Sequence, residues 1–128
     1  MPDVQPVFHL VLIGVDSYDP VLKPLHGCVN DIDAVQGVFV DGPGFEFDGQ
    51  IEVTRLVSRH DTGRGASTIE ESGATRDEIL DALEDLAGKV GPNDRVHIHY
   101  SGHGGQYAWK KDGRETGAWS EGLLTSDG

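Results

Sequence analysis

The sequence predicts an α/β fold with an open, mostly parallel sheet flanked by helices. Strand patterns and helix patterns alternate along the chain in the order strand, helix, strand, helix, strand. Right-handed crossovers are the economical way to join such elements, and they make the strands parallel. The first strand pattern, Val7–Val15, is almost unbroken in its apolar character, which is typical of a strand covered by helices on both faces. The chain of 128 residues has the length of a single domain.

The first helix and the second strand follow a loop over residues 16–27. The helix is predicted by apolar residues at helical spacing, namely Val29, Ile32, Val35 and Phe39. It is expected to end at the turn Asp41-Gly-Pro-Gly. Gln50–Val57 then alternates between polar and apolar residues, as a half-buried strand does.

The second helix carries the clearest local signal. Thr75 and Glu78 form a capping-box pattern at its start, and Gly91-Pro92 ends it. Apolar residues between these signals form one stripe: Ile79, Leu83, Leu86 and Val90. The strand pattern Arg95–Tyr100 follows directly.

Three segments are predicted to be irregular or incomplete. Residues 58–73 are expected to form an exposed loop, because Gly, Ser, Thr and charged residues dominate them. Residues 110–122 are polar and are also interpreted as a loop. Leu123–Thr125 is expected to begin a further strand.

The net charge of the chain limits the kinds of molecule that we expect it to bind. Ten Lys and Arg residues against 22 Asp and Glu residues give a formal net charge of −12. This balance argues against binding to nucleic acid or to an anionic membrane surface, both of which attract clustered basic residues. A basic ligand, a basic substrate or a bound cation fits the charge better.

The cellular compartment is predicted from the single cysteine and the apolar runs. Cys28 has no partner for an internal disulfide, so nothing indicates an oxidising compartment. The start of the chain has no basic-then-apolar leader, and the longest apolar run, Leu10–Val15, is too short to cross a membrane. We therefore expect a soluble, cytoplasmic protein.

The sharpest chemical signal is the segment Tyr100–Gly105, which follows the last strand pattern. Open α/β sheets bind their ligands at the carboxyl ends of strands, and His103 stands at such an end between two glycines. Glycine lets backbone approach a substrate closely, and the N–H of Gly104 is suited to stabilise an oxyanion. The alternative is a structural histidine in a glycine-rich turn.

The segment Tyr100-Ser-Gly-His-Gly104 resembles the catalytic-histidine motif of caspase-like cysteine peptidases, most closely the metacaspase and orthocaspase branch. Further segments are similar to that family in order and spacing: Leu12–Asp16, Leu25–Asp31, Thr75–Ile79 and Gly91–Asp94. The resemblance extends from Phe8 to about Asp127. It implies the caspase-like (caspase-hemoglobinase) fold and a peptidase with a Cys–His dyad.

By this resemblance, a cysteine thiolate attacks the peptide carbonyl, His103 exchanges the protons, and the N–H of Gly104 helps to hold the oxyanion. In caspase-like enzymes the cysteine lies roughly 50 residues after the histidine, but no cysteine follows His103 here. Residues 1–128 are therefore expected to form the N-terminal, large-subunit part of a peptidase domain. The catalytic cysteine is expected on a second chain or a missing segment, so the chain alone should be inactive and leave a sheet edge unpaired.

Cys28 is an alternative nucleophile. It lies at a predicted helix N-terminus, a position that lowers the pKa of a thiol. The competing interpretation is a small packed residue, and the resemblance favours it, because the family keeps this cysteine in addition to its nucleophile.

Asp31 and Ser101 match positions that line the metacaspase pocket for the residue before the cut bond. The match implies substrates with Arg or Lys at that position, since a carboxylate makes strong charge-assisted hydrogen bonds to a guanidinium. The alternative for Asp31 is a helix cap.

No cofactor is expected. His97 and His99 have metal-ligand character, but no third ligand accompanies them. The resemblance implies that their strand is buried between helices, so we interpret them as packed or hydrogen-bonded histidines. Calcium activation, which occurs in several metacaspases, is an alternative for the acidic residues after the histidine: Asp112, Glu115, Glu121 and Asp127. A solvated acidic loop without EF-hand spacing is the competing interpretation.

The charge, the motifs and the family resemblance leave three functions to consider. The first is a cysteine endopeptidase directed at arginine or lysine, and the second is a non-catalytic caspase-fold module that binds partner proteins. A nucleotide- or metal-binding domain is disfavoured, because no glycine-rich phosphate loop follows the first strand. A lone exposed arginine in the glycine-rich setting of the loop over residues 58–73 is a candidate autoprocessing site, and four arginines surround this loop: Arg55, Arg59, Arg64 and Arg76.

Overall fold

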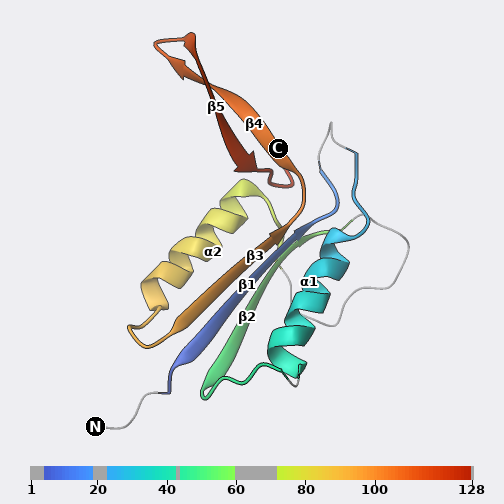
Figure 1. Cartoon of the computed structure of the whole chain (residues 1–128), viewed down its shortest axis with the longest axis vertical. Coiled ribbons are helices and arrows are strands. Elements are labelled where there is room, and N and C mark those ends of the chain that lie inside the picture. The colour runs from blue at the N-terminus through green and yellow to red at the C-terminus, as the bar shows by residue number, and fades with distance from the viewer. Residues whose placement is uncertain (1–4, 19–22, 43, 60–71, 128) are drawn as a thin grey trace.

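Three parallel strands form the centre of the molecule (Figure 1). The computed structural model describes four stretches of the chain: residues 5–18, 23–42, 44–59 and 72–127. Strand β1 (Val7–Val15) pairs with β2 (Gln50–Ser58) on one side and with β3 (Arg95–Ser101) on the other. Each strand ends within one residue of its predicted range, so the open, mostly parallel α/β sheet is confirmed.

The helices α1 (Cys28–Gln36) and α2 (Arg76–Lys89) cover opposite faces of this sheet (Figure 1). Successive strand residues point to opposite faces. On β1, Leu10 packs in the cluster that includes residues of α1, whereas Val11 packs in the cluster that includes residues of α2. Every β1 residue after Val7 is buried, as expected for a strand covered on both faces.

The helix α1 continues into a short π-helical turn, η1 (Gly37–Asp41), which carries the predicted helix to its expected end. Arg55 of β2 is buried and ties this region to the sheet, because its guanidinium lies 2.6 Å from Asp33 Oδ1 and 2.8 Å from Gln36 Oε1. A buried guanidinium requires such partners. Arg55 is therefore not the exposed arginine that the autoprocessing prediction requires, and Arg64 lies outside the described residues.

The start of α2 is stabilised as its capping-box pattern predicts. Thr75 Oγ1 accepts from the N–H of Glu78 at 3.2 Å and donates to Glu78 Oε1 at 2.8 Å. Glu78 Oε2 also accepts from the N–H of Gly73 at 2.9 Å. The carboxylate of Asp127 accepts from the N–H of Arg76 at 3.0 Å, so the last described residue also contributes to this helix end.

The predicted loop over residues 110–122 is wrong, because an antiparallel hairpin of β4 (Gly104–Lys111) and β5 (Arg114–Leu123) occupies it. The hairpin turn is Asp112-Gly113, with φ values of 54° and 77°. Asp-Gly is typical of two-residue hairpin turns with positive φ. This dipeptide indicates the hairpin, whereas the polar composition of the segment led to the prediction of a loop. The strand expected to begin at Leu123 is also wrong, since β5 ends there.

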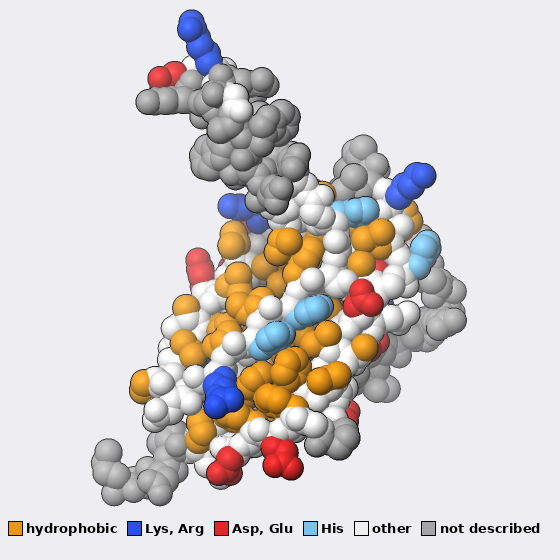
Figure 2. Space-filling model, viewed as in Figure 1, with side chains coloured by type: hydrophobic (Ala, Val, Ile, Leu, Met, Phe, Trp, Pro, Cys, Tyr) orange, Lys and Arg blue, Asp and Glu red, His pale blue; other side chains and the backbone are white. Residues whose placement is uncertain are grey.

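The strand β3 lies at an edge of the sheet and pairs with β1 alone among the described residues. It is not buried between helices as predicted: Val96 and Ile98 are 43% and 49% exposed, and His97 and His99 are half-buried. Figure 2 shows apolar side chains spread over one face of the molecule, with acidic side chains near its rim.

None of the described helices has the length and apolar character that a membrane crossing requires.

Candidate active site

Residues from three distant segments meet where β1 and β3 end (Figure 1). Asp16 directly follows β1, Ser101 is the last residue of β3, and Asp31 lies in the first turn of α1. Because β1 and β3 are neighbouring parallel strands, their carboxyl ends lie at one edge of the sheet. This is the edge at which the sequence predicts the chemistry.

Asp16 caps α1 from outside the helix. Its buried carboxylate accepts from the N–H of Cys28 at 2.8 Å and from the N–H of Val29 at 3.3 Å. A carboxylate is favourable at the positive end of a helix and satisfies N–H groups that have no partner within it. Asp16 thereby joins the end of β1 to the helix that carries Asp31, a role not assigned to it by sequence reasoning.

The predicted pocket residues Asp31 and Ser101 are in contact. Ser101 Oγ donates to Asp31 Oδ2 at 2.8 Å, and the carboxylate is exposed. The side chain of Asp31 thus faces Ser101, and the helix cap considered for it is supplied by Asp16. An exposed carboxylate beside a hydroxyl is suited to bind a cationic group.

Cys28 is a poor nucleophile in this setting. The side chain is buried, with 8% exposed. Burial raises the pKa of the Cys28 thiol, and the carboxylates of Asp16 and Asp31 act in the same direction, against a hydrogen bond with Ser101 that lowers it. The lowered pKa predicted from the helix N-terminus is therefore wrong, because burial has the largest effect on this thiol and raises its pKa.

His103 follows β3 by two residues and is held by two tyrosines. Its N–H donates to Tyr18 Oη at 2.6 Å, and its carbonyl oxygen accepts from Tyr100 Oη at 2.8 Å. Gly102 is required here, because a Cβ at that position would lie 2.5 Å from both tyrosine hydroxyls. The glycine before the histidine therefore makes room for protein groups.

The imidazole of His103 has a defined orientation. Its Nε2 lies 3.1 Å from the carbonyl oxygen of Lys23. A carbonyl only accepts, so Nε2 carries the proton when this bond forms. In the neutral ring Nδ1 is then left with its lone pair, the state that a general base needs.

The N–H of Gly104 points away from β5. Gly104 pairs with Leu123, while the N–H of Leu124 donates to the carbonyl oxygen of His103 at 3.0 Å. This pattern makes Gly104 and Leu123 a pair without hydrogen bonds between them, in which the N–H groups point outward from the ladder. The geometry is compatible with an oxyanion donor next to the histidine.

The residues considered for metal binding do not gather at this edge. The rings of His97 and His99 stack at 6.3 Å between centroids, and His97 packs on Phe39 at 4.8 Å.

The acidic residues after His103 are dispersed. Asp112 lies in the hairpin turn, whereas Asp127 lies at the start of α2, where hydrogen bonds from Thr125 and from the N–H of Arg76 lower the pKa of its carboxyl group. The side chains of Glu115 and Glu121 lie outside the described part. Within that part, no three His, Cys, Asp or Glu residues form a metal-binding group.

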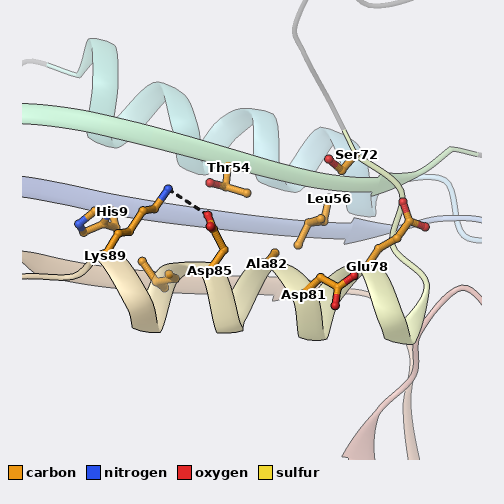
Figure 3. A pocket seen from close by; sticks show the side chains of 10 residues that line it. His9, Thr54, Leu56, Ser72, Glu78, Asp81, Ala82, Asp85 and Lys89 are labelled. Carbon is orange, nitrogen blue, oxygen red and sulfur yellow. Dashed lines mark ion pairs between the residues drawn. The ribbon is translucent and has the colours of Figure 1, made fainter.

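A separate cleft of about 380 Å³ lies between α2 and the sheet (Figure 3). Three of its charged residues already have protein partners: Glu78 binds at the cap of α2, and Lys89 lies 3.4 Å from Asp85 and 2.9 Å from Glu52. None of the candidate active-site residues lines it. The lining consists of His9, Thr54, Leu56, Ser72, Glu78, Asp81, Ala82, Asp85, Leu86 and Lys89.

Comparison with known proteins identifies the family. A family model described as "Metacaspase, peptidase C14 domain" matches residues 9–127. The chain belongs to the metacaspase family. This membership accounts for the caspase-like fold and agrees with the mostly parallel sheet and its two covering helices.

Curated metacaspases show the same relationship. The chain is 31% identical to Metacaspase-1 of Schizosaccharomyces pombe over 117 residues, which are 91% of the chain and 25% of that relative. It is also 31% identical over 117 residues to Metacaspase-1A of Neurospora crassa, covering 91% of the chain and 23% of the relative. Metacaspase-1 of Candida albicans is 34% identical over 96 residues, which are 75% of the chain and 19% of the relative. The chain thus spans about a quarter or less of the length of these metacaspases.

Proposed function

We propose that this metacaspase chain supplies the general base and part of the substrate pocket of a cysteine endopeptidase that cleaves after Arg or Lys. The observation that carries the proposal is the orientation of His103, whose Nε2–H donates to the Lys23 carbonyl oxygen while Nδ1 keeps its lone pair. The pocket pair Asp31 and Ser101 lies beside it at the same edge of the sheet. Family membership supports a peptidase.

The proposed reaction is ordinary thiol acyl transfer. Nδ1 of His103 takes the proton of the cysteine thiol, and the sulfur attacks the carbonyl carbon of the scissile bond. The N–H of Gly104 stabilises the negative charge on the carbonyl oxygen. The imidazolium then protonates the leaving amine as the C–N bond breaks, and water hydrolyses the thioester.

The cysteine in this proposal comes from a second chain or a further segment. Cys28 does not fit the role, because it is buried and its pKa is raised. The edge position of β3 favours an additional strand beside it, because β3 pairs only with β1 among the described residues and its Val96 and Ile98 expose apolar surface. Without that cysteine the chain is expected to be inactive.

The preference for a basic residue rests on Asp31. Its exposed carboxylate accepts one hydrogen bond from Ser101, and it has further acceptor capacity for a guanidinium or an ammonium group. The net charge of −12 favours basic substrates at longer range. A cytoplasmic location belongs to the same proposal and is supported by the single cysteine.

The test has a genetic part and a chemical part. The coding sequence beyond Gly128 is read for a strand that ends in a cysteine, and the protein that includes this segment is labelled with an arginine-directed, cysteine-reactive peptide. We expect labelling that is lost in His103→Ala and kept in the matched histidine variant His97→Gln. A stop codon at that point, or no labelling of the complete protein, would instead favour the non-catalytic interaction module.

The proposed chemistry uses protein groups alone. Calcium activation through the acidic residues after His103 is a separate proposal, and it is tested by assaying the same labelling with EGTA and with added Ca²⁺. Autoprocessing at Arg59 or Arg76 is tested by mass spectrometry of the active protein.

A further inference from the structure

Tyr18 stands behind His103 and contacts both its backbone and its ring. Its hydroxyl accepts from the His103 N–H at 2.6 Å, and the two rings lie 4.9 Å apart at an angle of 55°. We infer that Tyr18 is a positioning residue that fixes the direction of the His103 imidazole. Its meaning for catalysis rests on the proposed function, but the contact itself does not.

The hydroxyl groups of Tyr18 and Tyr100 form a hydrogen-bonded chain with one consistent direction. Burial raises the pKa of Tyr100, which keeps its phenol protonated and able to donate. Its single proton is shared between the carbonyl oxygens of Leu124 at 2.6 Å and His103 at 2.8 Å. With that proton committed, Tyr18 Oη donates to Tyr100 Oη at 3.1 Å and accepts from the His103 N–H.

This chain restrains the peptide groups on both sides of the His103 Cα. The N–H of His103 binds one phenol, and its carbonyl oxygen binds the other. That carbonyl oxygen also accepts from the N–H of Leu124, the residue directly after the end of β5. Hydrogen bonds on both sides of one Cα fix the direction of the Cα–Cβ bond, from which the imidazole projects.

The ring is restrained in addition to the backbone. One side of the imidazole packs against the Tyr18 ring, and Nε2 binds the Lys23 carbonyl oxygen. These two contacts leave Nδ1 as the nitrogen available to a nucleophile. The same tyrosine therefore acts on the backbone and on the ring.

Tyr18 is itself rigidly placed. Its side chain is 7% exposed and belongs to the core cluster on the α2 side, together with Val15 and Leu56. The phenol thus has its ring in the core and its hydroxyl at the candidate active site. Such a residue transmits the rigidity of the packed core to a histidine that follows a strand.

The test removes the hydroxyl and keeps the ring. In Tyr18→Phe the amide of His103 loses its acceptor, and we expect its hydrogen-exchange protection to fall about five- to tenfold. Protection of the β3 amides that bind β1 should stay unchanged. In ¹⁵N NMR the Nε2–H proton of His103 should exchange faster with water than in the wild type.

Gly102→Ala approaches the same contact from the other side, because its Cβ would push both hydroxyls away. We expect the same loss of His103 protection. Gly104→Ala is the matched control for this exchange experiment, because the nearest atom to its Cβ would be 3.7 Å away. If Tyr18→Phe does not fold, Gly102→Ala alone decides the outcome.

Kinetics of the protein that carries the cysteine supply the catalytic readout. Tyr18→Phe should lower kcat about tenfold or more through misalignment and leave KM within about twofold. Unchanged His103 protection in both variants would overturn the inference. Reduced protection in a protein that proves to have no peptidase activity would support the positioning contact and refute the proposed function.

Discussion

Ser101 Oγ donates a hydrogen bond to Asp31 Oδ2 across 2.8 Å, although the two residues lie 70 positions apart in the chain. The contact forms because β3 ends beside β1, while α1 begins close to the end of β1. Asp16 holds that helix start in place through two backbone N–H groups. The pocket pair is therefore a product of the sheet order and of one buried carboxylate.

Asp31→Asn should weaken cleavage after arginine. The variant keeps a hydrogen-bond acceptor for Ser101 and loses the charge that would face a guanidinium. Hydrogen bonds to charged groups contribute about 1.5–3 kcal/mol, so we expect kcat/KM to fall about 10- to 100-fold. The measurement uses the protein that carries the catalytic cysteine and compares fluorogenic peptides with Arg and with Gln before the cut bond. Asp48→Asn, an exposed acidic residue away from this edge, changes the net charge equally and serves as the control; an equal loss in both variants would contradict the pocket role.

Asp16→Ala should destabilise the fold through loss of the α1 cap. Removing a capping side chain costs about 0.5–2 kcal/mol, and the free energy of unfolding from urea titration should fall by that amount. Asp16→Asn should recover most of the loss, because an amide oxygen also accepts from helix N–H groups. A fall in Asp16→Ala no larger than in Asp16→Asn would show that the cap does not stabilise α1.

Asp94 should make stability depend on pH at the acidic end. Hydrogen bonds from the N–H of Gly91, from His9 and from the N–H of Val7 lower the pKa of Asp94 to about 2 from 3.8. Because the folded-state pKa is the lower one, this stabilisation is present above about pH 4 and is lost as the pH falls toward 2.

Urea midpoints at pH 6, 4 and 2.5 test this prediction for Asp94. Asp94→Asn should start from a lower stability at pH 6 and lose less of it on acidification than the wild type. The exposed Asp41→Asn should follow the wild-type curve. Parallel acid curves for the wild type and Asp94→Asn would exclude Asp94 as the titrating group.

Cys28 should react slowly in the folded protein. It is the only cysteine in the chain, so an alkylating reagent at sulfur reports on it alone. Burial and the raised pKa both reduce the accessible thiolate, and we expect the iodoacetamide rate at pH 7.5 to rise at least tenfold on unfolding in urea. Rapid labelling of the folded chain, with the far-UV circular dichroism spectrum intact, would revive Cys28 as a nucleophile.

The sequence by itself determined the elements whose signals are local. The apolar run of β1 and the capping box of Thr75 and Glu78 predict their elements almost to the residue, because strand period and helix caps depend on near neighbours. The motif around His103 indicated the family in the same way, and the family comparison confirms it. Polarity concealed the β4–β5 hairpin, where the turn Asp112-Gly113 was the informative signal.

Only the tertiary structure decided which distant groups meet. Three hydrogen-bonded contacts at the candidate active site join residues from different segments of the chain. Asp16 caps α1, Ser101 binds Asp31, and the N–H of His103 binds Tyr18. The pKa of the Cys28 thiol is likewise raised by its burial and by neighbouring carboxylates, which its position in the sequence does not reveal. Hydrogen bonds and desolvation act over a few ångströms in space, and spacing along the chain does not reveal those distances.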